Sequence, residues 1–222
     1  GKNRVDVARR TVHLSPIFVG FRDYVDDFGG SHAAVGRWMA RYFPPGLERE
    51  LLESGRFEDM FSEAASGAPV PPERGWGLLD AFFRDEMHRQ TLVPGAADAL
   101  ERIGEVADIV ILTNLGDEAH QWRVDQLAGH GIGHQVVCNR GGKGAPVASL
   151  VAERRPSAAV FVDDLAVHHQ SVAKHAPEVW RLHMIAEPRM ARAVPPAEDA
   201  HARIDDWGSA CEWILARLEG AE

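Results

Sequence analysis

The sequence predicts an α/β fold with a Rossmann-like, three-layer core, in which helices cover both faces of a parallel sheet. From Val93 onward, short apolar runs alternate with amphipathic stretches of about ten residues, which is typical of βαβ units. The run 158–162 is apolar throughout, as expected for a strand buried on both faces of a parallel sheet. Residues 15–92 contain several helical stretches and almost no such run, so we predict an all-helical domain inserted into the core.

Strands and helices of the core are predicted in alternation. Pro94 opens the first helix, and apolar residues recur after it at helical spacing. Gly129, Gly131 and Gly133 follow a helix and not a strand, which indicates a helix end and not a nucleotide-binding loop. The predicted helices are 94–105, 117–127, 146–154, 165–175 and 209–218, and the predicted strands are 108–113, 135–138, 158–163 and 179–185.

The inserted domain is predicted to be a helical cap. Bulky apolar residues gather on one side of its stretches 37–43 and 78–83, and the proline-rich segment 67–72 divides it. The chain would then consist of a core, residues 1–14 and 93–222, and a cap, residues 15–92. The predicted cap helices are 31–42, 47–53, 57–65 and 77–90.

Composition excludes several functional classes. The 222 residues carry a formal charge of −9 with no basic stripe, so a nucleic acid would be repelled. No apolar run approaches the roughly 18 residues of a membrane span, and the first residues do not resemble a signal peptide. The two cysteines give no disulfide framework or metal spacing. We therefore expect a cytoplasmic protein that binds neither nucleic acid nor membrane; the sequence leaves its oligomeric state open.

Two adjacent carboxylates, Asp163 and Asp164, end the apolar strand 158–162. Open α/β sheets bind their ligands at the carboxyl ends of their strands. Neighbouring like charges repel, and a cation offsets that repulsion. Oxygen ligands of this kind suit Mg²⁺. The alternatives are a strand end that opens an exposed loop and an aspartate that caps the next helix.

Further polar residues are expected at the same edge of the sheet. Thr113 and Asn114 end the strand that begins at Asp108, and Lys143 lies in the glycine-rich loop 141–144 just before a helix. The glycines would let the backbone bring the ammonium group close to an anion. Alone, Thr113 is also explained as a strand-end hydroxyl that satisfies the next turn, and Lys143 as a solvated loop lysine.

In this order and spacing, the motifs resemble those of the haloacid dehalogenase superfamily, whose members are mostly phosphatases. The second motif matches residues 111–114, the third Lys143, and the fourth residues 161–164. The resemblance implies a Mg²⁺-dependent hydrolase of a small phosphorylated metabolite, with a cap inserted between the first and second motifs. It also implies that Thr113 and Lys143 hold phosphoryl oxygens and that Asn114 orients the substrate or the nucleophile.

The first motif departs from the family pattern of an apolar strand followed by Asp-x-Asp. In one register the strand is 2–5, Asp6 is the nucleophile and a metal ligand with Asp163 and Asp164, and Ala8 replaces the general acid and base. A second register places the segment 13–15 at the motif and leaves no nucleophile. We favour Asp6, because Val12 and Leu14 then fall in the apolar stretch that follows the motif.

Ala8 leaves two alternatives to a phosphatase. A protein of this fold without activity would bind a phosphorylated ligand or a protein partner. A metal-independent 2-haloacid dehalogenase needs no general acid, since halide leaves as a stable anion, but the unneutralised pair Asp163 and Asp164 would repel its carboxylate substrate.

Some polar residues are expected to be structural. One of His168 and His169, on the helix after Asp164, could approach the site, but an exposed histidine or one in the first turn of the helix is the favoured prediction. Asp205 and Asp206 repeat the twin-acid pattern but follow a weakly apolar stretch, which favours a loop and helix cap. Cys138 is predicted to be a core residue at a strand end.

Overall fold

The structure is a computed structural model, which describes residues 10–14, 68, 71, 84, 87–89, 92–186, 191–192 and 194–220. The chain divides into two compact units, residues 1–18 with 91–222, and residues 19–90. The helices predicted over 15–92 lie outside the described residues, except that helical Arg84 and the 3-10 helix η2, Met87–Arg89, fall within the predicted helix 77–90. Among the described residues no helix is long and apolar enough to cross a membrane.

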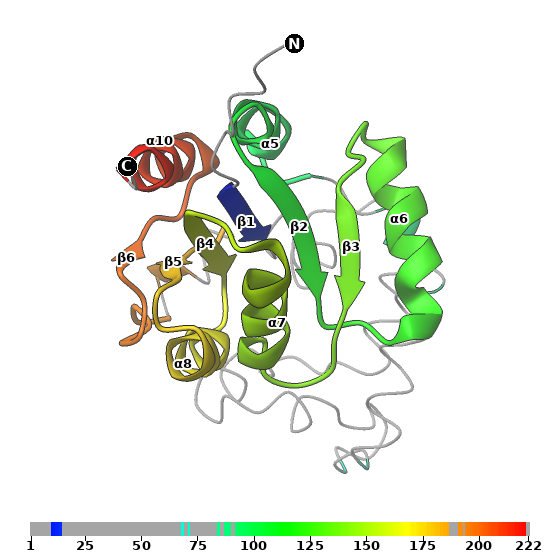
Figure 1. Cartoon of the computed structure of the whole chain (residues 1–222). Helices are drawn as coiled ribbons and strands as arrows, with labels where there is room; N and C mark the ends of the chain where they lie inside the picture. The colour runs from blue at the N-terminus through cyan, green and yellow to red at the C-terminus, as the bar shows by residue number, and fades with distance from the viewer. Residues whose placement is uncertain are drawn as a thin grey trace. The chain divides into compact units, whose positions relative to one another are not determined.

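A parallel sheet forms the centre of the larger unit (Figure 1). Its six strands lie in the order β3-β2-β1-β4-β5-β6, and every neighbouring pair is parallel. The predicted α/β parallel fold is therefore confirmed, although the two-residue strand β6 was not predicted. The strands are β1, Arg10–Leu14; β2, Asp108–Thr113; β3, Gln135–Cys138; β4, Ala158–Asp163; β5, Trp180–His183; and β6, Ala202–Arg203.

The helices between the strands follow the predicted alternation. Predicted strands 108–113, 135–138 and 158–163 have the observed bounds, whereas helix ends differ by a few residues. The helix after β2 begins with a 3-10 turn, and Gly131 has φ +75° just beyond its end, as expected of a helix stop. The helices are α5, Ala96–Gly104; η3, Asp117–Ala119; α6, His120–Gly129; α7, Gly144–Arg154; α8, Ala166–His175; and α10, Trp207–Glu219.

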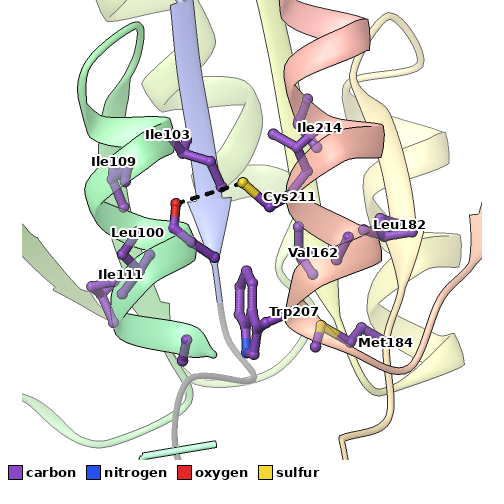
Figure 2. Packing of buried hydrophobic residues seen from close by; sticks show 14 of the residues in the cluster. Leu100, Ile103, Ile109, Ile111, Val162, Leu182, Met184, Trp207, Cys211 and Ile214 are labelled. Carbon is purple, nitrogen blue, oxygen red and sulfur yellow. Dashed lines mark hydrogen bonds between the residues drawn. The ribbon is translucent and has the colours of Figure 1, made fainter. Parts of the chain in front are cut away.

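Two apolar layers hold these helices against the two faces of the sheet. On one face, α5 and α10 pack over the strands around the fully buried Trp207 (Figure 2). On the other face, Val147 of α7 and Val172 of α8 pack against Leu112 and Phe161. Alternate residues of β2 and β4 thus enter opposite layers, which explains why these two strands are apolar along almost their whole length.

The amino end of α10 is closed by Asp206, whose carboxylate accepts a hydrogen bond of 2.8 Å from the backbone N–H of Ser209. Asp205 instead accepts a bond of 2.9 Å from the N–H of Ile185. The prediction that this second acidic pair forms a loop and a helix cap is confirmed. Cys138, predicted to be a core residue, is only half-buried.

The central strand of the sheet is β1, which pairs with β2 on one side and β4 on the other. Leu14, its last residue, lies opposite Ile111 and Val162. The prediction that residues 2–5 supply this strand is wrong, since residues 10–14 occupy the place between β2 and β4. The next residue after the strand is Ser15. Asp6 lies outside the described residues; its role, inferred from a strand at 2–5, stays a prediction without that support.

Candidate functional site

The sheet positions the predicted polar residues along one edge. Thr113 ends β2 and Asp163 ends β4, and both strands flank β1. Because the strands are parallel, their carboxyl ends meet at this edge, where sheets of this kind bind ligands. Thr113 is half-buried, whereas Asn114 and Asp164 are exposed. Buried strand residues therefore lead directly into polar groups that face solvent.

Lys143 and Asp163 form a buried ion pair at this edge. The Nζ atom of Lys143 donates to Oδ2 of Asp163 over 2.7 Å, and the two side chains are 2% and 0% exposed. The other oxygen, Oδ1, accepts a bond of 2.9 Å from the N–H of Leu165. Lys143 is therefore not the solvated loop lysine that the sequence allowed. Its ammonium group is paired with a carboxylate of the protein, and its role toward a phosphoryl group stays a prediction.

The pKa of Asp163 reflects this setting. Burial alone would raise its pKa, but the charge of Lys143, with smaller contributions from His168 and from the hydrogen bonds of Lys143 and Leu165, outweighs burial. The pKa of the carboxyl group ends below its ordinary value. Asp163 is therefore an anion that serves to hold the ammonium group in place.

Asp164 has the opposite character. Removal from water and the adjacent charge of Asp163 raise its pKa to about 7, against a smaller opposing effect of Lys143. The side chain of Asp164 is nevertheless solvent-exposed, so repulsion from Asp163 is the better supported of the two causes. An added cation would relieve that repulsion.

Two asparagines position the loop that carries Lys143. The Nδ2 group of Asn114 donates to the carbonyl of Gly141 over 2.9 Å. The Nδ2 group of Asn139 donates to Oδ1 of Asn114 over 3.0 Å and to the carbonyl of Gly141 over 3.2 Å. Gly141 has φ +88°, a conformation that favours glycine. These contacts explain how a glycine-rich loop can present a lysine in one place.

The same loop lies very close to α8. A Cβ atom on Gly144 would stand 2.0 Å from the backbone oxygen of Ser171, and one on Gly142 would stand 2.6 Å from the Ser171 hydroxyl. The N–H of Gly144 also donates to that hydroxyl over 3.0 Å. The glycines are thus required for close packing, in addition to the backbone freedom predicted for them.

Three histidines surround the acidic pair. His168 and His169 lie in the first turn of α8, as one of the two predictions had it, but they are 5% and 0% exposed, so the prediction that they are exposed is wrong. The Nε2 atom of His168 lies 3.3 Å from Nδ2 of Asn114. Nε2 of His169 lies 3.0 Å from the carbonyl oxygen of Asp163, and Nε2 of His183 lies 3.0 Å from that of Asp164. Burial lowers the pKa of His169 to about 4, so this imidazole is neutral.

The residues fit a divalent cation in part. Carboxylate oxygens are suitable ligands for Mg²⁺, and Asp164 offers an exposed carboxylate beside a second negative charge. Both oxygens of Asp163, however, already accept hydrogen bonds from protein donors. Within the described part of the chain, no three His, Cys, Asp or Glu side chains form a group that could hold a metal. The further predicted ligand, Asp6, lies outside that part.

The structure thus brings Lys143 to Asp163, and Asn114 to the loop of Lys143, while Thr113 ends the strand on the other side of β1. Sequence reasoning missed Asn139 and His183. Asn139 follows a predicted strand directly, which is a usable signal. His183 is the last residue of its strand, in a sequence stretch that reads as ordinary core, and gave no such signal.

No family model matches the chain. A phosphoserine phosphatase from Thermus thermophilus is 36% identical over 105 residues, which is 46% of this chain and 41% of that protein. The chain therefore matches less than half the length of this relative.

Solved structures match nearly the whole chain at low identity. A haloacid dehalogenase-like hydrolase from Streptococcus pneumoniae has a TM-score of 0.61 at 11% identity, covering 94% of this chain and 98% of that one. A Bacillus subtilis HAD-hydrolase described as bound to magnesium has a TM-score of 0.54 at 12% identity, covering 94% and 99%. An L-2-haloacid dehalogenase has a TM-score of 0.52 at 15% identity, also covering 94% and 99%. Together with the topology of its sheet, these matches show that the chain has the haloacid dehalogenase-like fold, as its motifs indicated.

Proposed function

We propose that this chain is a phosphatase-like hydrolase that binds the phosphoryl group of a small metabolite at the carboxyl edge of its sheet. The observation that carries the proposal is the buried pair of Lys143 and Asp163, which fixes a cation at the edge where β2 presents Thr113 and Asn114. The partial match to a phosphoserine phosphatase supports the same substrate class.

The chemistry needs positive charge and hydrogen-bond donors. In phosphoryl transfer, negative charge spreads over the equatorial oxygens of the phosphorus, and catalysis depends mainly on positioning and charge stabilisation. In our proposal the ammonium group of Lys143 and the hydroxyl of Thr113 hold these oxygens. Asn114, already hydrogen-bonded to the lysine loop, orients the substrate or the nucleophile.

Mg²⁺ is part of the proposal. When bound, it would neutralise charge on the phosphoryl oxygens. Asp164 would hold it through its exposed carboxylate, with Asp163 and Asp6 as the other predicted ligands. The raised pKa of Asp164 supports a cation at this position, as does the magnesium described in the Bacillus subtilis structure of the same fold.

Whether the chain hydrolyses a phosphate ester, or only binds one, depends on the nucleophile. If Asp6 attacks phosphorus, Ala8 leaves the leaving alkoxide without a proton donor, a group that typically contributes about 10²–10⁴-fold to rate. We therefore propose slow hydrolysis, fastest on activated esters such as aryl phosphates. The charge argument against halide release is weaker in the structure than in the sequence, because Lys143 neutralises Asp163 and only Asp164 is left to repel the carboxylate of a 2-haloacid.

The second candidate function is binding of a phosphorylated ligand without turnover. The observation that favours it is the register of β1, in which Leu14 lies beside Val162, the residue before Asp163. The residues that follow Leu14 are Ser15, Pro16 and Ile17. None of them is a carboxylate, so in this register the central strand supplies no attacking group.

The test combines activity with binding. A panel of alkyl and aryl phosphate monoesters, assayed with and without Mg²⁺, should show Mg²⁺-dependent release of phosphate, and inorganic phosphate should bind in calorimetry. Thr113→Val, which removes a hydroxyl at nearly constant shape, should weaken both. Binding with no turnover would select the second function. Metal-independent chloride release from 2-haloacids, or neither activity nor phosphate binding, would overturn the proposal.

A further inference from the structure

The backbone carbonyls of Asp163 and Asp164 accept hydrogen bonds from different kinds of donor. The carbonyl of Asp163 accepts a bond of 3.0 Å from the N–H of Met184, which continues the ladder between β4 and β5. Asp164 lies one residue beyond the end of β4. Its carbonyl instead meets Nε2 of His183 at 3.0 Å. The residue with the exposed carboxylate is therefore attached to the next strand through a side chain.

The second nitrogen of His183 fixes how that imidazole is protonated. Its Nδ1 atom accepts a bond of 2.9 Å from the N–H of Ala197, and Nη1 of Arg203 lies 3.4 Å from the same atom. An imidazole that accepts at Nδ1 and faces a carbonyl oxygen at Nε2 carries its proton on Nε2. His183 is 0% exposed; its contact with Ala197 is buried, whereas its contact with the exposed residue Asp164 is part-buried.

The segment on the far side of His183 is itself anchored. The guanidinium of Arg203 donates to the carbonyls of Val194 and Ala191, each over 3.2 Å, and forms an ion pair with Asp205. Asp205 also accepts from the N–H of Ile185. His183 thus connects Asp164 to Ala197, in a stretch in which Arg203 binds the carbonyls of Ala191 and Val194.

From these contacts we propose that His183 is a positioning residue, which holds the backbone of Asp164 so that its carboxylate stays at the ligand-binding edge. The inference rests on the proposed function for its effect on ligand binding, but its effect on the backbone does not. Groups that orient ligating residues through one hydrogen bond typically change metal affinity or activity by about 10–100-fold when removed.

Two substitutions separate the two contacts of the imidazole. His183→Gln places an amide donor near the position of Nε2 and loses the acceptor at Nδ1. His183→Asn places an acceptor near the position of Nδ1 and loses the donor to Asp164. His201→Asn is the matched control, because His201 is exposed and its Nδ1 accepts from the N–H of Arg181, outside the site. Thermal unfolding of each variant measures how far the substitution lowers the melting temperature, independently of ligand binding.

Binding of inorganic phosphate in the presence of MgCl₂ is measured by calorimetry, well below the melting temperature of every variant. His183→Asn should weaken binding about tenfold or more, whereas His183→Gln and His201→Asn should stay within about threefold of the wild type. Binding by His183→Asn as tight as that of His183→Gln would overturn the inference. Absence of phosphate binding by the wild type would instead count against the proposed function.

Amide hydrogen exchange tests the inference whether or not phosphate binds. The N–H of Leu165 donates to Asp163 in the turn that contains Asp164, so its protection reports on that turn. His183→Asn should speed its exchange at least tenfold over His183→Gln, with Val110, a buried β2 residue, unchanged. Equal exchange at Leu165 in the two variants would overturn the positioning role.

Discussion

The ammonium group of Lys143 lies 2.7 Å from the carboxylate of Asp163, and neither side chain is more than 2% exposed. Removing both charges from water costs several kcal/mol for each ion, and their attraction offsets this only when the geometry is good. The N–H of Leu165 supplies a further hydrogen bond to the carboxylate. A buried pair of this kind adds little net stability, but each partner depends on the other.

Removal of the lysine charge should therefore be costly. Lys143→Met leaves Asp163 buried and uncompensated, and we expect the free energy of unfolding to fall by about 3–5 kcal/mol. Urea denaturation at pH 7 measures this difference. Arg140→Met is the control, because its ion pair with Glu118 is exposed at both ends, and it should change stability far less.

The double variant Lys143→Met, Asp163→Leu removes both charges together. It should regain most of the stability lost by Lys143→Met, because no buried charge is left unpaired. If the free energy lost by the double variant equals the sum of the losses of Lys143→Met and Asp163→Leu, the two residues do not depend on each other.

Acid should weaken the same pair. The pKa of Asp163 is lowered in the folded chain, so its ionised form stabilises the fold above the ordinary value of 3.8. That stabilisation is lost as pH falls through the lowered pKa. The wild type should exceed Asp163→Asn in free energy of unfolding by its largest amount at pH 6, and this excess should shrink below pH about 4. Urea denaturation at several pH values measures it. A difference that is constant with pH would argue against the depressed pKa.

Asp164 should behave in the opposite way. Its pKa is raised to about 7, so ionisation favours the unfolded chain, and the fold loses stability as pH rises from about 4 to about 7. Asp164→Asn should therefore gain melting temperature over the wild type at pH 8 and not at pH 4. Millimolar Mg²⁺ should reduce the gain if a cation binds there. Glu101→Gln, an exposed change on α5, should not reproduce this pattern.

The strands β2, β3 and β4 could be predicted because the residue pattern that identifies each one lies within the strand itself. The strand that ends at Asp163 is apolar on both faces, and a short run of this kind with β-branched residues, bounded by polar ones, favours a buried parallel strand. The cap of α10 at Asp206 is equally local, because an aspartate bonds an N–H a few residues ahead. Such features need no knowledge of the rest of the chain.

The remaining features depend on distant contacts. His169 looked like a surface residue of a helix turn, but the sheet brings it under the carbonyl of Asp163. The register of β1 is set by pairing with β2 and β4, and its residues Arg10–Leu14 do not resemble a buried strand by composition. Asn139 holds the lysine loop only because β3 ends beside β2. Sequence patterns could not supply these relationships.

The close approach of α7 to α8 gives a further prediction. A Cβ on Gly144 would stand 2.0 Å from the backbone of Ser171, so Gly144→Ala must push the two helices apart. We expect a loss of about 1–3 kcal/mol, as for overpacked cores, together with weaker phosphate binding because Lys143 precedes this residue. Gly133→Ala, where a Cβ would meet nothing within 4 Å, is the matched control in urea denaturation and calorimetry. Equal effects at the two glycines would contradict this packing.

The N-terminal motif gives the last prediction. If Asp6 is the nucleophile, the function missing at Ala8 is proton transfer alone. Ala8→Asp should then raise turnover of alkyl phosphates by about 10²–10⁴-fold. Aryl phosphates should gain less, because their leaving groups need little protonation. Steady-state phosphate release with Mg²⁺ present measures both.

Asp6→Asn is the control for the same experiment. It should abolish the activity of both the wild type and Ala8→Asp, because an amide does not attack phosphorus in place of a carboxylate. The register of β1, which puts Ser15 after the central strand, predicts something else: all three proteins would be equally inactive while still binding inorganic phosphate. That outcome would remove Asp6 from its role and leave a phosphate-binding protein on a hydrolase fold.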